Sequence, residues 1–170
     1  MDQVARDGLN GLSLRGVAAA LGIAPNALYR YFADRAALEA ALAEESQRRL
    51  LGALQKAAGK KSPEQALRSI ARAYVRFARE QPHVFSLTLL PSTPEAGSEP
   101  AHVELWRFVQ TQVSSLYGEH LAPQAAVTLW AFLHGMTALE AAGVLGQQKP
   151  TSSFDFGLRL WIEAATPPIT

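Results

Sequence analysis

The sequence contains no cysteine, which excludes a disulfide framework and a zinc site built on thiolates. Alternating runs of β-branched residues are almost absent, so the pattern typical of half-buried strands is missing. The first residues include acidic side chains and no long apolar segment, and we therefore expect no secretory signal. These absences favour a helical protein of a reducing compartment, and the expected location is the cytoplasm.

An excess of charge of either sign is also missing. The formal net charge is +1, and the first fifty residues carry six basic and six acidic side chains. Nucleic-acid-binding domains are commonly indicated by a basic surface, and the overall charge gives no such indication here. Any contact with DNA therefore has to come from a few side chains on a docking helix.

The long apolar stretch 121–146 raises the question of a membrane span. It carries Gln124, His134 and Glu140, and a carboxylate in the middle of a span costs about 2.5 to 3.5 kcal/mol even on insertion scales. A buried helix in a bundle explains the stretch better, and we expect no association with a membrane.

Helix-forming residues dominate what is present. The chain has 170 residues, of which 48% are hydrophobic, enough for a packed core. Ser13 is placed to cap a short helix that ends at Gly22. After a tight turn, Pro25 suits the first turn of a second short helix through Tyr31. The sequence thus predicts an all-α protein that begins with two short helices joined by a turn.

Further helices follow at regular intervals. Asp34 is placed to cap a helix that runs to Gly59, and Ser62–Gln65 combines a capping box with a first-turn proline. Pro82 opens a short helix through Leu89, and residues 91–100 read as an exposed, flexible loop. The most regular apolar pattern lies in the helix after the capping box and comprises Leu67, Ile70, Ala71, Tyr74, Phe77 and Ala78. Later apolar patterns predict further helices over 103–116, 123–145 and 154–161.

The segment SLRGVAAALGIAPNALYRYFADRAAL, which begins at Ser13, resembles the DNA-binding domain of the TetR family of bacterial repressors. The likeness includes an LYxxF ending at Phe32 and the restart of a helix after it. It implies a three-helix DNA-binding domain over 1–45, with the helix-turn-helix motif at 13–32. The remainder, 46–170, is then an antiparallel helical bundle for ligand binding and dimerisation.

The resemblance implies DNA contacts for individual residues. Asn26 and Ala27 open the recognition helix, where an asparagine can read adenine and an alanine can touch a thymine methyl group. Tyr29 matches the family tyrosine that faces DNA. Ser13 as a plain helix cap and Arg15 as a solvated side chain are alternative interpretations. The full expected set is Ser13, Arg15, Pro25, Asn26, Ala27, Tyr29, Tyr31 and Arg35.

Two departures from the family pattern stand out. Ala24 replaces the serine or threonine that caps the recognition helix in many relatives, and only about two helical turns are available before Gly8. We expect either that a natural N-terminal segment is missing from the first helix or that DNA binding is weakened.

A second resemblance lies at Trp130–Gly135. These residues are similar to the tryptophan and histidine-glycine (WHG) signature of one class of TetR-family ligand domain. Ligand cavities are mostly apolar with a few placed polar groups, although ordinary core packing explains each aromatic residue as well. Glu140 is another inward polar candidate, with an arginine of the N-terminal domain or a donor in the pocket as possible partners. The expected pocket walls are Tyr74, Phe77, Phe85, Trp106, Trp130 and His134.

Helices over about 123–146 and 152–165 are apolar on too many sides for single-sided burial. We expect them to form a two-fold, four-helix interface between two copies of the chain, in agreement with the family's usual dimer. The resulting homodimer reads a near-palindromic operator.

The sequence therefore predicts a ligand-responsive, DNA-binding transcriptional regulator, a repressor released by a small apolar molecule. An enzyme is the first rival class, but His83, His102, His120 and His134 form no known catalytic or metal-binding pattern. We accordingly expect no catalysis, cofactor or metal. The second rival is a helical module that binds small molecules or dimerises without engaging DNA. Neither motif encodes a particular effector, an operator or the choice between repression and activation.

Overall fold

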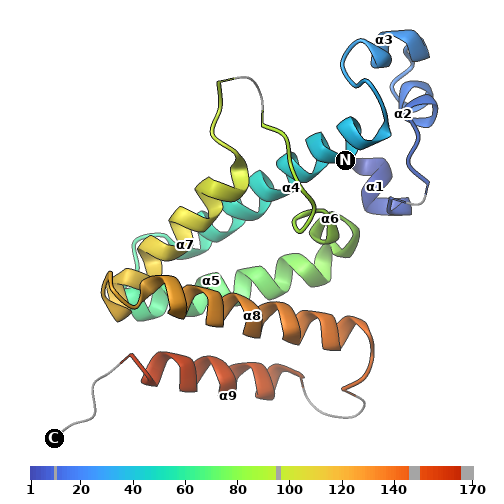
Figure 1. Cartoon of the computed structure of the whole chain (residues 1–170). Helices are drawn as coiled ribbons and strands as arrows, with labels where there is room; N and C mark the ends of the chain where they lie inside the picture. The colour runs from blue at the N-terminus through green and yellow to red at the C-terminus, as the bar shows by residue number, and fades with distance from the viewer. Residues whose placement is uncertain (10, 95–96, 146–149, 166–170) are drawn as a thin grey trace, which may run out of the picture. The chain divides into compact units, whose positions relative to one another are not determined.

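The regular structure of the protein is helical. The computed structural model describes residues 1–9, 11–94, 97–145 and 150–165, and every regular element in these ranges is a helix (Figure 1). The all-α prediction is confirmed, and no helix in these ranges is both long and apolar enough to cross a membrane. The helices are α1 (Asp2–Asp7), α2 (Leu14–Ala20), α3 (Pro25–Tyr29), α4 (Arg35–Ala58), α5 (Pro63–Glu80), α6 (Pro82–Leu87), α7 (Ala101–Tyr117), α8 (Ala122–Ala141) and α9 (Pro150–Glu163).

The chain folds into two compact units. The first combines Met1–Leu51 with Glu80–Leu105, and the second combines Gly52–Arg79 with Trp106–Thr170. The chain passes between the units within α4, at the end of α5 and within α7. The sequence-based division into functional domains 1–45 and 46–170 stays a prediction.

Local signals in the sequence form the tight turn between α2 and α3. The Ser13 Oγ accepts the Gly16 N–H at 3.0 Å and so caps α2, as predicted. α2 ends in a Schellman motif, in which Gly22 has φ 67° and the N–H groups of Gly22 and Ile23 donate to carbonyls in the last turn. Pro25 then occupies the first turn of α3, where its missing N–H is not needed.

A compact apolar cluster supports this turn within the first unit. α1 packs against α6, and α2 packs against α3. Asp34 caps α4, as predicted, because its Oδ1 accepts the Ala37 N–H at 2.8 Å. The buried members of the cluster come from α1, α2, α3, α4, α6 and the segment before α2: Val4, Leu12, Leu14, Ala18, Leu28, Leu38 and Leu87.

Two buried polar side chains of α4 hold neighbouring segments of the first unit. The Gln47 side-chain amide donates to the carbonyls of Thr88 and Leu90, at 3.2 and 3.3 Å. The Glu44 Oε1 accepts the N–H of Ala101 at 3.0 Å, at the start of α7. α4 is thus tied by hydrogen bonds to the chain that follows α6 and to the first turn of α7.

In the second unit, α5 buries the face that its sequence period predicts. The six apolar residues named for this helix, Leu67 through Ala78, are all buried. α8 and α9 pack closely, since the Trp161 indole N–H donates to the Ala125 carbonyl at 3.2 Å and Gly157 lies directly against the Phe132 ring. The Tyr117 hydroxyl donates to the Trp161 carbonyl and joins α7 to α9.

α3 ends two residues earlier than predicted. The helix stops at Tyr29, because the N–H groups of Tyr31 and Phe32 both donate to the carbonyl of Leu28 and close the last turn. Tyr31 therefore lies beyond the helix and is 79% exposed.

The ends of two other helices were also predicted too late. α6 ends at Leu87, and Leu89 lies outside it. α8 ends at Ala141 and not near Leu145, because Gly143 has φ 67° and a Schellman motif forms there. Residues 91–94 and 97–100 lie outside the helices, as predicted for the loop.

Candidate functional site

The exposed face of α3 gathers the side chains expected to read DNA. Pro25, Asn26 and Tyr29 are exposed, whereas Leu28 on the opposite face is buried in the apolar cluster. Tyr29 keeps 47% of its surface accessible although it adjoins a core residue. Nearly half of the tyrosine surface therefore remains open to a partner outside the unit.

Most of the neighbouring positions are exposed as well. Arg15 lies in the first turn of α2, next to the capping residue Ser13. Ala27 is half-buried on α3, and Tyr31 follows that helix. A short, exposed helix that follows a capped helix and a tight turn has the order of elements that a helix-turn-helix uses in the major groove.

Arg35 has a structural role that its sequence position did not reveal. Its Nε donates to Glu39 Oε1 at 2.6 Å, and its Nη2 donates to the carbonyl of Leu9 at 2.9 Å. The side chain therefore ties α4 to the segment after α1. A guanidinium carries further N–H donors, so these two bonds still leave capacity for a phosphate.

Within the second unit, three of the predicted pocket residues form a hydrogen-bonded group. The buried Tyr74 hydroxyl lies 3.3 Å from Nδ1 of His134 and also hydrogen bonds to the Trp130 side chain. Burial raises the pKa of Tyr74 to about 12, and the bond with Trp130 opposes that shift. Trp106 meets Trp130 edge-on, with ring centroids 6.4 Å apart. A small polar group thus lies among aromatic rings.

The other pocket predictions have different outcomes. Phe77 is buried on α5, whereas Phe85 belongs to α6 in the first unit. Trp130 is 45% exposed, so only part of its ring can face an interior. Glu140 pairs with Arg79 of α5, at 2.9 Å, and not with an arginine of residues 1–45 as expected.

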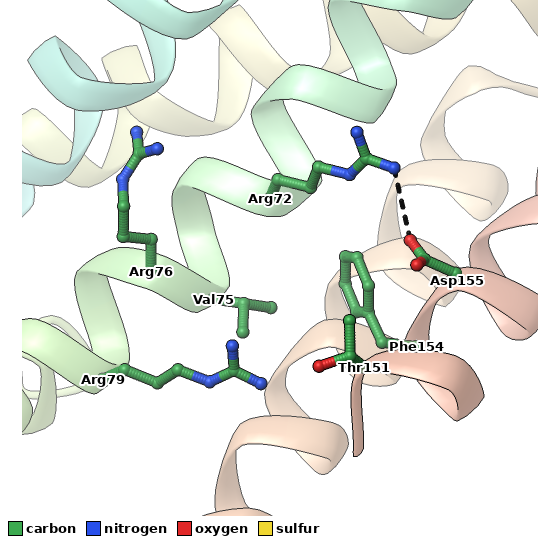
Figure 2. Close-up of a pocket in the computed structure, with 7 residues that line it drawn as sticks. All are labelled: Arg72, Val75, Arg76, Arg79, Thr151, Phe154 and Asp155. Carbon is green, nitrogen blue, oxygen red and sulfur yellow. Dashed lines mark hydrogen bonds and ion pairs between the residues drawn. The ribbon is translucent and has the colours of Figure 1, made fainter. Parts of the chain in front are cut away.

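A cavity of about 240 Å³ lies between α5 and α9 (Figure 2), and none of the six predicted pocket residues lines it. Its apolar part is formed by Val75 and Phe154, both buried. Arg72 lies at one end and pairs with Asp155 at 3.3 Å. Arg79 lies at the other end, and Thr151 and Arg76 complete the lining.

Sequence reasoning missed this cavity, although one signal for it was visible. Arg72, Arg76 and Arg79 recur at intervals of four and three residues, which places them on one side of a helix. Their partner surface comes from α9, more than seventy residues later in the chain, and only the folded structure shows that the two helices meet there.

The α8–α9 pair also presents apolar side chains to the surface. Val127 and Leu139 are exposed on α8, together with Trp130. On α9, Phe156 is 54% exposed and Leu160 is 49% exposed. Both helices bury one side and leave further apolar area uncovered, as their sequences predicted.

No metal site is evident in the part of the chain that the structure describes, because no three histidine, aspartate or glutamate side chains there are grouped as ligands.

Comparisons with known proteins give one consistent family. The model of bacterial regulatory proteins of the tetR family matches residues 1–42, and that of the tetracyclin repressor-like C-terminal domain matches residues 67–160. The chain is 24% identical over 159 residues to the uncharacterized HTH-type transcriptional regulator YobS of Bacillus subtilis (strain 168), which covers 92% of this chain and 83% of the relative.

Two solved structures are similar over nearly the whole chain. A protein of unknown function from Rhodococcus sp. RHA1 has a TM-score of 0.78 and 26% identity, with 96% of this chain and 89% of the other covered. A "possible TetR family transcriptional regulator" from Streptomyces coelicolor A3(2) has a TM-score of 0.66 and 23% identity, with coverages of 96% and 93%. At 23% identity, the likeness to the Streptomyces coelicolor protein shows a shared fold only.

Proposed function

The chain belongs to the TetR family of DNA-binding transcriptional regulators, and we propose that it is a homodimeric repressor of the cytoplasm that a small apolar effector releases from a near-palindromic operator. We place its ligand domain in the WHG class. The protein acts by binding, without catalysis.

The exposed start of α3 is the observation that carries DNA binding. Asn26 and Ala27 enter the major groove and contact base edges, while Tyr29 faces DNA beside them. The flanking Ser13, Arg15, Pro25, Tyr31 and Arg35 position the helix, mainly through phosphates. Specificity then comes from α3, and the flanking contacts set its orientation.

Dimerisation uses the uncovered apolar area of α8 and α9. The predicted interface spans 123–146 and 152–165, of which residue 146 lies outside the described residues. Exposed large side chains on both helices support a four-helix contact with a second copy. Such a dimer presents two recognition helices roughly 34 to 36 Å apart, one turn of DNA.

The effector binds within the second unit, against Tyr74, Phe77, Trp106, Trp130 and His134. Its binding shifts the segment 82–89 and α4 and so changes the spacing of the two DNA-binding heads. The hydrogen bonds from Gln47 of α4 to the carbonyls of Thr88 and Leu90 support this coupling. The effector can lower the affinity for DNA only by as much as its own affinity differs between the two spacings of the heads.

A fluorescence-anisotropy titration tests the proposal. The full chain is titrated onto DNA flanking its own gene, at several salt concentrations and with nonspecific competitor. We expect saturable binding that weakens steeply with salt. Substitution of Tyr29 by alanine should weaken binding about 10-fold or more without lowering the melting temperature.

A matched pair of charge variants makes the test specific. Arg15→Gln and Lys60→Gln each remove one positive charge from an exposed position, but only Arg15 lies beside the recognition helix, and Lys60 lies outside the proposed dimer interface. We expect weaker DNA binding and a shallower salt dependence for Arg15→Gln alone. Equal effects of the two variants would show that the contact is nonspecific.

The alternative is a helical module that binds small molecules or dimerises without engaging DNA. The balanced charge of the first fifty residues favours it. Binding no better than to competitor, at every salt concentration, would put this alternative ahead.

A further inference from the structure

We propose that the cavity between α5 and α9 binds a small molecule with a carboxylate head and a flat apolar body. This site goes beyond the proposed function, because its lining shares no residue with the effector-binding residues proposed above. The proposal does not require that DNA binding succeeds.

The floor of the cavity suits an apolar body. Val75 of α5 and Phe154 of α9 are buried, and Figure 2 shows them facing each other between Arg72 and Arg79. The Phe154 ring also stacks on Phe132, with centroids 6.2 Å apart, and this contact holds it in place. A planar ring placed here exchanges contact with water for contact with apolar groups.

The rim of the cavity suits a carboxylate. Arg72 and Arg79 already bind carboxylates of the chain itself, Asp155 at 3.3 Å and Glu140 at 2.9 Å. Arg76 adds a third guanidinium, which points away from Phe154 (Figure 2). The three guanidinium groups against two carboxylates leave an excess positive charge that attracts an anion.

The internal ion pairs can be exchanged for a ligand. The side chains of Arg72 and Asp155 are 62% and 49% exposed, and exposed ion pairs contribute little to stability. A ligand carboxylate can therefore take the place of Asp155 on Arg72 with a small penalty, and a planar fork of N–H donors binds it in two-point fashion.

The volume limits the size of the molecule. At about 240 Å³ the cavity is smaller than the typical drug-sized pocket, which begins near about 300 Å³. A one- or two-ring aromatic acid fits this description, whereas a large polycyclic ligand does not.

Fluorine NMR with a fluoronaphthoate measures binding directly, on the full chain without DNA. We expect saturable broadening of the ligand signal by the wild-type protein. The corresponding neutral fluoronaphthamide, which has the same rings and no charge, should bind at least about 10-fold more weakly.

Two variants of one ion pair give effects of opposite sign. Arg72→Gln should weaken fluoronaphthoate binding about 10-fold, while Asp155→Asn should strengthen it about 3- to 5-fold by removing a competing charge. Lys60→Gln, in the turn after α4, changes the net charge as Arg72→Gln does but lies outside both the cavity lining and the proposed dimer interface, and it should leave binding within about 2-fold.

The NMR measurements test the cavity proposal independently of whether the protein binds DNA. Opposite shifts for Arg72→Gln and Asp155→Asn, with the amide excluded, support a carboxylate site. Absence of saturable binding, equal binding of the acid and the amide, or equal losses in Arg72→Gln and Lys60→Gln would overturn it. A failed DNA titration leaves all of these measurements unchanged.

Discussion

Replacement of Gly157 by alanine tests the close packing of α8 on α9. A Cβ atom built on Gly157 lies 2.5 Å from both Cε2 and Cζ of the Phe132 ring, a separation that real Cβ atoms do not adopt. These atoms lie at the outer end of the ring, and the stacked Phe154 ring, with centroids 6.2 Å apart, limits how far the Phe132 ring can turn. The variant therefore has to move a ring or separate the two helices.

The magnitude follows from two opposing effects. An extra methyl group in a filled interface costs about 1 to 3 kcal/mol, whereas alanine is better than glycine within a helix by about 1 kcal/mol. The expected net loss in the free energy of unfolding is about 0 to 2 kcal/mol. Gly52, which has no atom within 4 Å of its built Cβ, is the matched control, and Gly52→Ala should gain about 0.5 to 1 kcal/mol.

Thermal unfolding by circular dichroism measures the difference. The melting temperature of Gly157→Ala should lie several degrees below that of Gly52→Ala, since about 1 kcal/mol shifts a chain of this size by about 2 to 4 °C. Protein concentration is held fixed, because association shifts apparent stability. If Gly157→Ala stabilises the protein as much as Gly52→Ala does, the packing argument is wrong. A Phe132→Leu background should reduce the loss, because it shortens the opposing side chain.

Three further predictions concern other parts of the molecule. Burial raises the pKa of Tyr74 to about 12, against about 10 when unfolded, so its contribution to stability is complete below about pH 10 and lost as pH rises toward about 12. Because burial also raises the pKa of Tyr117, Tyr74→Phe should show a smaller decline in denaturant titrations over this range, and an identical decline in both proteins would contradict the prediction. Ser13→Ala should reduce unfolding free energy by about 1 kcal/mol, because the Gly16 N–H loses its acceptor, and an unchanged urea midpoint would refute this. Leu160→Glu places a charge in the proposed α8–α9 interface and should yield monomers in light scattering at concentrations where the parent is a dimer; a persisting dimer would move the interface elsewhere.

Local chemistry in the sequence determined most of the secondary structure. Ser13, Pro25 and Asp34 begin helices as predicted, because capping and first-turn proline act within a few residues of themselves. Periodic burial predicted the inward face of α5 for the same reason. The resemblance at 13–32 identified the family before any tertiary contact was known, and the family models confirm it.

Helix ends were less predictable. α8 ends at Ala141 because Gly143 adopts φ 67° and turns the chain, although the apolar pattern continues to Leu145. Apolar periodicity indicates which residues prefer burial, but it does not predict where the backbone hydrogen bonds of the helix end.

The tertiary structure alone decided how the functional side chains are partnered. Arg35 was predicted from its position as a DNA contact, but its bonds to Glu39 and to the Leu9 carbonyl become apparent only when α4 and the segment after α1 are placed together. The cavity between α5 and α9 likewise depends on Arg72 meeting Asp155, 83 residues away. Capping and periodicity act over a few residues and can be read from the order of the chain, whereas a pairing over that separation depends on how the helices pack, which no local pattern encodes.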